Sequence, residues 1–157
     1  TATEYAPVRY VAAASQTATC LPLMTDREYG TPEAEAVLFL SRNQASGRVL
    51  TWFDYGQYAI WHLAPRVEVS YDGRRETVYS ERVQRAHRAF YAGDASYARR
   101  LQADFIWLPK QLPVVRRLLA DEWHLAFAGP RSVILAAKPG AYPEPSPYVG
   151  PRCFPGP

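Results

Sequence analysis

The sequence predicts an α/β fold with three layers, in which a mostly parallel sheet is flanked by helices and ends in an antiparallel hairpin. Short apolar runs typical of buried strands alternate with helical patterns, which is the order of parallel strand–helix–strand units. The last two apolar runs, at 122–128 and 132–137, are joined by a tight Gly129-Pro130 turn, so they should pair antiparallel. The length of 157 residues suits a single domain with its own core.

The first helix of this domain is expected over 31–43. Thr31 can cap it, Pro32 suits the first helical position, and Glu33 and Glu35 favour the positive end of the helix dipole. The next elements are a buried strand, a short apolar helix and an alternating strand, at 48–53, 54–63 and 66–71.

The second half of the domain continues the alternation. A helix at 80–91 carries an apolar stripe that includes His87 and Phe90, and Asp94 can cap a further short helix that ends near position 102. A buried strand follows at 104–108. Leu112, Val115, Leu118 and Leu119 are then expected to form the apolar face of the last helix before the hairpin.

The chain divides into an N-terminal extension at 1–30, the α/β domain at 31–138 and a tail at 139–157. The tail holds seven prolines and three glycines, so no regular structure is expected there. Cys20 and Cys153 lie in these two terminal segments, where a disulfide could tie loose ends together and would imply an extracytoplasmic compartment. Two unrelated thiols are the alternative.

Composition excludes several classes of protein. Apolar residues make up 48% of the chain and charged residues 21%, as in soluble globular proteins, and no apolar run approaches the roughly 18 residues that span a bilayer. The net charge of +3 is too small to indicate nucleic-acid binding. Sixteen arginines stand against two lysines, and seven of them fall between positions 74 and 100. This bias reflects either a GC-rich genome or a need for bidentate contacts with phosphate or carboxylate.

A candidate ligand site follows from the turns after the predicted strands. Because the carboxyl ends of parallel strands meet at one edge of a sheet, the residues directly after them should gather there. These residues are Asp54, Tyr55, Asp72, Arg74, Arg75 and Lys110. Arginine can bind phosphate, and carboxylates can accept hydrogen bonds from sugar hydroxyls, so the set suits a phosphosugar headgroup. The alternative is structural: Asp54 caps its helix together with Gln57, and Arg74 pairs with Asp72 or Glu76.

No catalytic motif completes this site. The cysteines and histidines lack metal-ligand spacing, no nucleophile-elbow serine is present, and neither a dinucleotide fingerprint nor a phosphate loop occurs. The sequence therefore predicts no catalytic residue, no cofactor and no metal. His62 and His87 lie on apolar faces and are expected to be core histidines.

Several short motifs, taken in their linear order, resemble a known family. They are Gly47-Arg48-Val49-Leu50, the run from Trp52-Phe53-Asp54-Tyr55-Gly56 to Trp61, Tyr71-Asp72-Gly73-Arg74-Arg75-Glu76 with Tyr79, Ala103-Asp104-Phe105-Ile106-Trp107-Leu108-Pro109, and Trp123. This pattern is similar to the soluble C-terminal domain of bacterial polytopic membrane glycosyltransferases of the GT-C type, which use polyprenyl-phosphate sugars. The resemblance covers about residues 31–137.

The resemblance implies a location and a role. In that family, the small α/β domain follows a many-helix membrane part and lies outside the cytoplasm, on the periplasmic or extracellular side. The main catalytic carboxylates sit on membrane loops, and nothing in this chain matches them. The resemblance thus implies a non-catalytic accessory domain, whose partners are the membrane-embedded part of its parent protein and a polyprenyl-phosphate sugar or an acceptor, and not nucleic acid. Two alternatives stay open: a free-standing α/β enzyme that acts on a sugar phosphate or ester through Asp54, Asp72 and Arg74, and a protein-interaction module.

Overall fold

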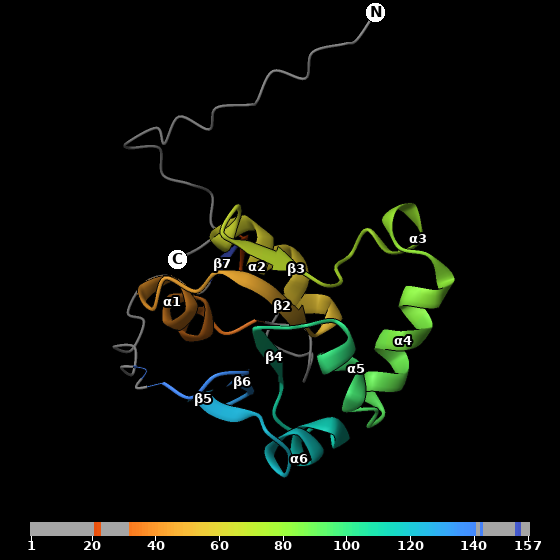
Figure 1. Ribbon diagram of the computed structural model, residues 1–157. Helices are drawn as coiled ribbons and strands as arrows, with labels where there is room; N and C mark the ends of the chain where they lie inside the picture. The colour runs from red at the N-terminus through yellow and green to blue at the C-terminus, as the bar shows by residue number, and fades with distance from the viewer. Residues whose placement is uncertain (1–20, 23–31, 141, 143–152, 155–157) are drawn as a thin grey trace, which may run out of the picture.

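The chain folds into an α/β structure with a five-stranded mixed sheet flanked by helices (Figure 1). The computed structural model describes residues 21–22, 32–140, 142 and 153–154. Along the domain, the elements are α1 (Ala34–Arg42), β2 (Gly47–Thr51), η1 (Phe53–Tyr55), α2 (Gly56–Leu63), β3 (Val67–Val69), α3 (Arg75–Val78), α4 (Glu81–Tyr91), α5 (Ser96–Arg100), β4 (Phe105–Pro109), α6 (Pro113–Leu119), β5 (His124–Ala128) and β6 (Ser132–Ala136). Among the described residues, no helix is long and apolar enough to cross a membrane.

The strand order is β3-β2-β4-β6-β5, and the sheet is half parallel and half antiparallel. Strand β2 pairs in parallel with β3 and β4, whereas β6 pairs antiparallel with both β4 and β5. The expectation of a mostly parallel sheet therefore needs correction, although the C-terminal antiparallel hairpin is confirmed. The reason lies in burial. All residues of β6 are buried, whereas every residue of β5 is exposed or half-buried, so β6 takes the inner position beside β4.

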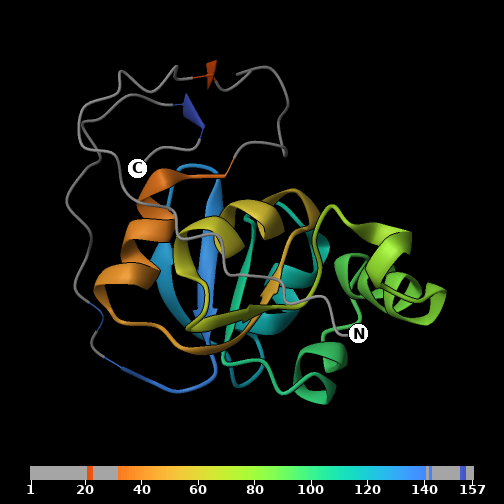
Figure 2. The ribbon, with the colours of Figure 1, turned by 90° about the horizontal axis from the view of Figure 1, so that it is seen from above.

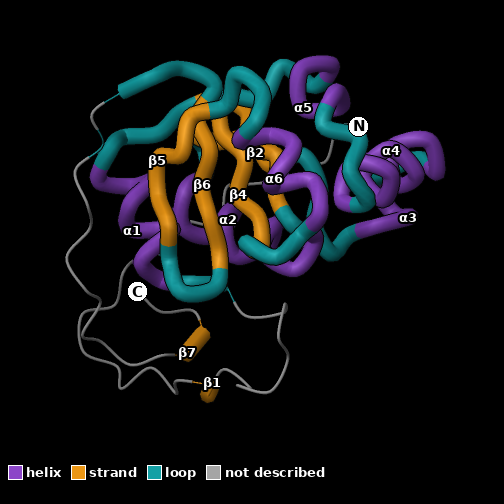
Figure 3. Tube along the Cα trace, turned by 90° about the horizontal axis from the view of Figure 1, so that it is seen from below, coloured by secondary structure: helices purple, strands orange, loops and turns teal. Residues whose placement is uncertain are grey.

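Two separate cores cover the two faces of the sheet, which makes three layers (Figures 2 and 3). Successive strand residues alternate between the cores, as the two-residue period of a strand requires. Val49 and Trp107 face the core formed with α1 and α2. Leu50 and Ile106 face the core formed with α4, α5 and α6.

Some helix starts differ from the sequence prediction. Helix α1 begins at Ala34 with Glu33 at its N-cap position, and Thr31 lies outside the described residues. The helix expected from position 54 begins as the 3₁₀ turn η1, and α2 then starts at Gly56 without a side-chain cap. Asp94 does not occupy the N-cap position of α5, which begins at Ser96 after Ala95, but its carboxylate accepts hydrogen bonds from the hydroxyl and the backbone of Ser96 at the start of that helix.

The terminal segments are described only in part. Strands β1 (Leu21–Pro22) and β7 (Cys153–Phe154) form an antiparallel pair apart from the main sheet, with Leu21 opposite Phe154 and Pro22 opposite Cys153 (Figure 3). Cys20 lies outside the described residues, and the side chain of Cys153 is not described. The disulfide and the predicted boundaries of the extension and the tail thus stay predictions.

Candidate functional site

The turn after β2 packs directly against the turn after β3. Gly56 makes this contact possible: a Cβ atom on Gly56 would lie 2.2 Å from the carbonyl oxygen of Tyr71 and 2.8 Å from Cβ of Asp72. Gly73 is similarly close to the amide of Gln57, with 2.8 Å between Nε2 and a Cβ placed on the glycine. The two turns thus form one compact unit, and the charged residue Asp72 is buried within it.

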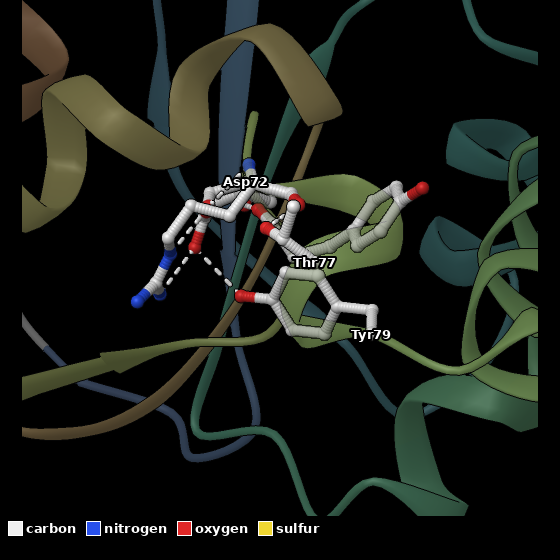
Figure 4. Close-up of polar contacts among 6 residues, drawn as sticks. Asp72, Thr77 and Tyr79 are labelled. Carbon is white, nitrogen blue, oxygen red and sulfur yellow. Dashed lines mark hydrogen bonds and ion pairs between the residues drawn. The ribbon is translucent and has the colours of Figure 1, made fainter.

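Each of the two carboxylate oxygens of Asp72 accepts two hydrogen bonds (Figure 4). Oδ1 accepts from the backbone nitrogen and from Nε of Arg74, both at 2.9 Å. Oδ2 accepts from Nη2 of Arg74 at 2.7 Å and from the hydroxyl of Tyr79 at 2.6 Å. The side chain of Asp72 is fully buried, whereas that of Arg74 is 53% exposed. The guanidinium is therefore fixed on its inner edge and open to solvent on its outer side.

The hydrogen bonds determine the protonation states of this cluster. The bond from the Arg74 side chain lowers the pKa of Asp72 to about 2, even though burial works against the charged form. Burial, followed by the bond to Asp72, raises the pKa of Tyr79 to about 12. Asp72 is consequently an ionised anchor at neutral pH, with its lone pairs already used. The structural alternative foreseen for Arg74, pairing with Asp72, is the arrangement that forms.

The side chains of Asp54 and Tyr55 lie in different environments, one exposed and one buried. Asp54 is exposed and accepts a hydrogen bond of 3.2 Å from the indole of Trp52, and it does not cap α2, so the capping alternative is wrong. Tyr55 is only 1% exposed and packs on the ring of Trp107 at 4.7 Å between centroids. Burial, with the nearby charge of Glu33, raises the pKa of Tyr55. Tyr55 thus belongs to the core and offers no free hydroxyl to a ligand.

The two remaining cationic residues of the predicted site are Arg75 and Lys110. Arg75 begins α3, and its side chain is not described. Lys110 follows β4 and lines a groove beside α6, whose lining includes none of the Asp72 cluster. Strand β2 lies between β3 and β4, so one strand separates the two turns that carry Asp72 and Lys110.

One buried polar cluster was not foreseen. Glu33 is 2% exposed, and its carboxylate accepts hydrogen bonds from the backbone nitrogens of Arg131 and Ser132 and from the Ser132 hydroxyl. The same hydroxyl accepts a hydrogen bond of 3.0 Å from the indole of Trp107. In the sequence, Glu33 looks like an ordinary first-turn glutamate, and no local signal marks a partner at the hairpin.

A second unforeseen contact pairs His87 with Ser70. His87 is fully buried, as its apolar stripe predicts, and its Nδ1 lies 3.0 Å from the carbonyl oxygen of Val83. A carbonyl only accepts, so Nδ1 carries the proton, and Nε2 accepts from the Ser70 hydroxyl at 3.0 Å. The ring stacks on Tyr71, with centroids 4.5 Å apart. Burial lowers the pKa of His87, which keeps this ring neutral.

Comparisons of the chain with protein-family models, with curated proteins and with solved structures found no match. Within the described ranges, no group of three or more histidine, cysteine, aspartate or glutamate side chains is placed to hold a metal ion. A functional proposal therefore depends on the geometry of this chain's own residues and on the motifs in its sequence.

Proposed function

We propose that this chain is a non-catalytic, extracytoplasmic accessory domain of a GT-C-like membrane glycosyltransferase. Its partners are the membrane-embedded part of the same parent protein and the phosphate-linked sugar headgroup of a polyprenyl lipid. The order of motifs in the sequence supports this role. So does the packing of the Asp54-Tyr55-Gly56 turn against the Asp72-Gly73-Arg74 turn, since two of the motifs that carry the resemblance form one structural unit.

The observation that carries the proposal is that the Arg74 guanidinium is held in place on one side and exposed on the other. Asp72 holds Nε and Nη2 of the guanidinium. With 53% of its side chain exposed, Arg74 presents a cation whose orientation is already fixed. A preorganised guanidinium loses little side-chain entropy when it binds a phosphate oxygen, so it suits recognition of a phosphosugar.

The same geometry argues against Asp72 as a catalytic base. A base needs a free lone pair and a pKa near the working pH. Both oxygens of Asp72 already accept two hydrogen bonds, and its pKa is about 2. Asp72 serves to position Arg74, and the role of the pair is binding.

Calorimetric titration of the chain with a short-chain isoprenyl phosphosugar tests this role. Arg74→Ala would leave the buried Asp72 without its main partner, so Arg74→Lys is the better variant, because lysine keeps the charge and loses the planar fork. We expect Arg74→Lys to weaken binding at least about tenfold, the effect of losing about 1.4 kcal/mol. Arg82→Lys, on the exposed face of α4, is the matched control and should bind like the wild type. Equal affinity of Arg74→Lys and wild type would refute the proposal.

Activity assays separate the accessory domain from the alternative of a small enzyme. The chain should show no turnover of nucleotide sugars, simple esters or phosphomonoesters. Asp54 is exposed, and it is the one acidic residue of the predicted site whose carboxylate is open to solvent. Turnover that Asp54→Asn abolishes, with an unchanged melting temperature, would establish the enzyme alternative instead.

A further inference from the structure

Helix α6 lies on one face of the sheet (Figure 3). A cationic groove lies beside this helix. Its volume is about 550 Å³, within the range of small-ligand sites. Six residues line it: Lys110, Gln111, Leu112, Pro113, Arg116 and Arg117. Three of the six are cations and none is acidic, so the groove concentrates positive charge on a chain whose net charge is only +3.

The groove arises from the helical spacing of α6. Pro113 lies one helical turn before Arg117, and Arg116 is the neighbour of Arg117, so these three exposed residues share the outer side of the helix, next to the half-buried Leu112. The inner side of the same helix carries Val114, Val115 and Leu118, which are buried in the core. Packing of α6 on the sheet therefore fixes the outward direction of both arginines.

One of these arginines is held in place by α4. Nη1 of Arg117 donates a hydrogen bond of 3.0 Å to the carbonyl oxygen of Gly93, which follows the C-terminus of α4. Gly93 has a φ of +129°, and a Cβ atom there would lie 3.2 Å from Cζ of Arg117. Glycine thus satisfies the backbone conformation and leaves room for the guanidinium to lie against the chain. All three cations are exposed, and the bond to Gly93 positions Arg117, whereas Lys110 and Arg116 can adjust to a ligand.

We propose that this groove binds a compact phosphate anion that carries at least two negative charges, a diphosphate or a phosphate monoester. Arginine and lysine side chains are the usual partners of phosphate oxygens, and the amide of Gln111 adds a neutral donor. Leu112 and Pro113 provide an apolar wall for the organic group attached to the phosphate. This site goes beyond the proposed function, since it uses none of the residues of the Asp72 cluster.

Titration of the full 157-residue chain with inorganic pyrophosphate tests the groove. We expect saturable binding, weakened at least tenfold in the double variant Lys110→Gln/Arg116→Gln. A matched control, Arg42→Gln/Arg82→Gln, removes the same net charge from exposed positions outside the groove and should bind within twofold of the wild type. All four side chains are exposed, so both variants should keep the wild-type melting temperature. No saturable binding, or equal affinity of wild type and the groove variant, would overturn the proposal.

The phosphate could belong to a soluble metabolite or to a lipid headgroup, and sedimentation with vesicles distinguishes these sources. Binding to phosphatidylcholine vesicles that contain phosphatidic acid, whose headgroup is a phosphate monoester, but not to pure phosphatidylcholine vesicles, lost in the groove variant alone, assigns the groove to a lipid phosphate. Pyrophosphate binding without vesicle binding assigns it to a soluble phosphate compound. Because Arg74 is intact in both variants, failure of this experiment leaves the phosphosugar test at Arg74 unaffected.

Discussion

The carboxylate of Glu33 accepts a hydrogen bond of 2.6 Å from the hydroxyl of Ser132, and both residues are buried although they stand 99 positions apart. Through this contact the start of α1 is tied to the β5–β6 hairpin. Gly129, in the hairpin turn, leaves the space for it, because a Cβ there would lie 2.2 Å from Oε2 of Glu33. A buried carboxylate with three donors behaves as part of the core and not as a surface charge.

We predict that Glu33→Ala destabilises the fold by about 2–4 kcal/mol, because it leaves three donors without their acceptor: two buried donors of Ser132 and the half-buried backbone nitrogen of Arg131. Ser132→Ala should cost about 1–3 kcal/mol, since the indole of Trp107 then loses its acceptor. Urea unfolding monitored by circular dichroism measures both values. Glu122→Ala, whose side chain is 85% exposed, is the control and should change the free energy of unfolding by less than about 0.5 kcal/mol. Equal effects of Glu33→Ala and Glu122→Ala would show that the buried contact is not stabilising.

A second prediction concerns the stability of the fold at acidic pH. The folded pKa of Asp72 is about 2, below its ordinary value of 3.8, so its ionised form stabilises the fold fully above about pH 4, and this contribution is lost as the pH falls towards 2. The shift corresponds to about 2 kcal/mol. Asp72→Asn should therefore be less stable than wild type at pH 7 by about that amount, and the difference should shrink between pH 4 and 2. Unfolding curves at several pH values measure it, with the exposed Glu68→Gln as control. A difference that stays constant over this range would contradict the prediction.

The third prediction concerns His87, whose pKa is lowered by burial. The ring is neutral in the folded state, and the groups around it are the Val83 carbonyl, the Ser70 hydroxyl, Tyr71 and Tyr97. Because the unfolded histidine titrates near pH 6.5, the free energy of unfolding should fall as the pH drops below about 6.5. His87→Gln should lack this part of the pH dependence, whereas the exposed His124→Gln should keep it. Identical pH profiles for wild type and His87→Gln would be the contrary result.

The fourth prediction is a disulfide between Cys20 and Cys153. Leu21–Pro22 pairs with Cys153–Phe154, so the chain directly after Cys20 runs beside Cys153. In the chain-entropy model, a bridge around so long a loop stabilises by about 4–5 kcal/mol. Intact-mass analysis after alkylation should show no modified cysteine before reduction and two after it. Two alkylated thiols in protein made under oxidising conditions, without reductant, would remove this support for an extracytoplasmic location.

The sequence was sufficient to predict most elements because their patterns are local. The near-continuous burial of β2 and β4 and the apolar stripe of α4 follow from the positions of apolar residues alone. The sheet order was less accessible, because hydrophobic pattern does not say which strand of the hairpin pairs with β4. That choice follows from the full burial of β6, which depends on both helical layers.

The candidate site was predicted in part. The contact of Gly56 with Asp72 agrees with the expectation that turns after neighbouring parallel strands lie together. The directions of the side chains could not be predicted in the same way. Tyr55 faces the core, and the carboxylate of Glu33 bonds to the hairpin as well as lying at the positive end of the helix dipole. Such directions depend on partners that are distant in the sequence. The residues next to Tyr55 and Glu33 in the chain do not indicate which partners these are.

The two edges of the sheet have a consequence for behaviour at high concentration. Edge strand β3 has only three residues, with the exposed Glu68 at its centre, and edge strand β5 is interrupted by a bulge between Leu125 and Phe127. A short, charged edge and an irregular one are poor templates for a strand from another molecule. The domain should therefore resist edge-to-edge aggregation, even though Leu125 leaves an apolar side chain exposed on β5.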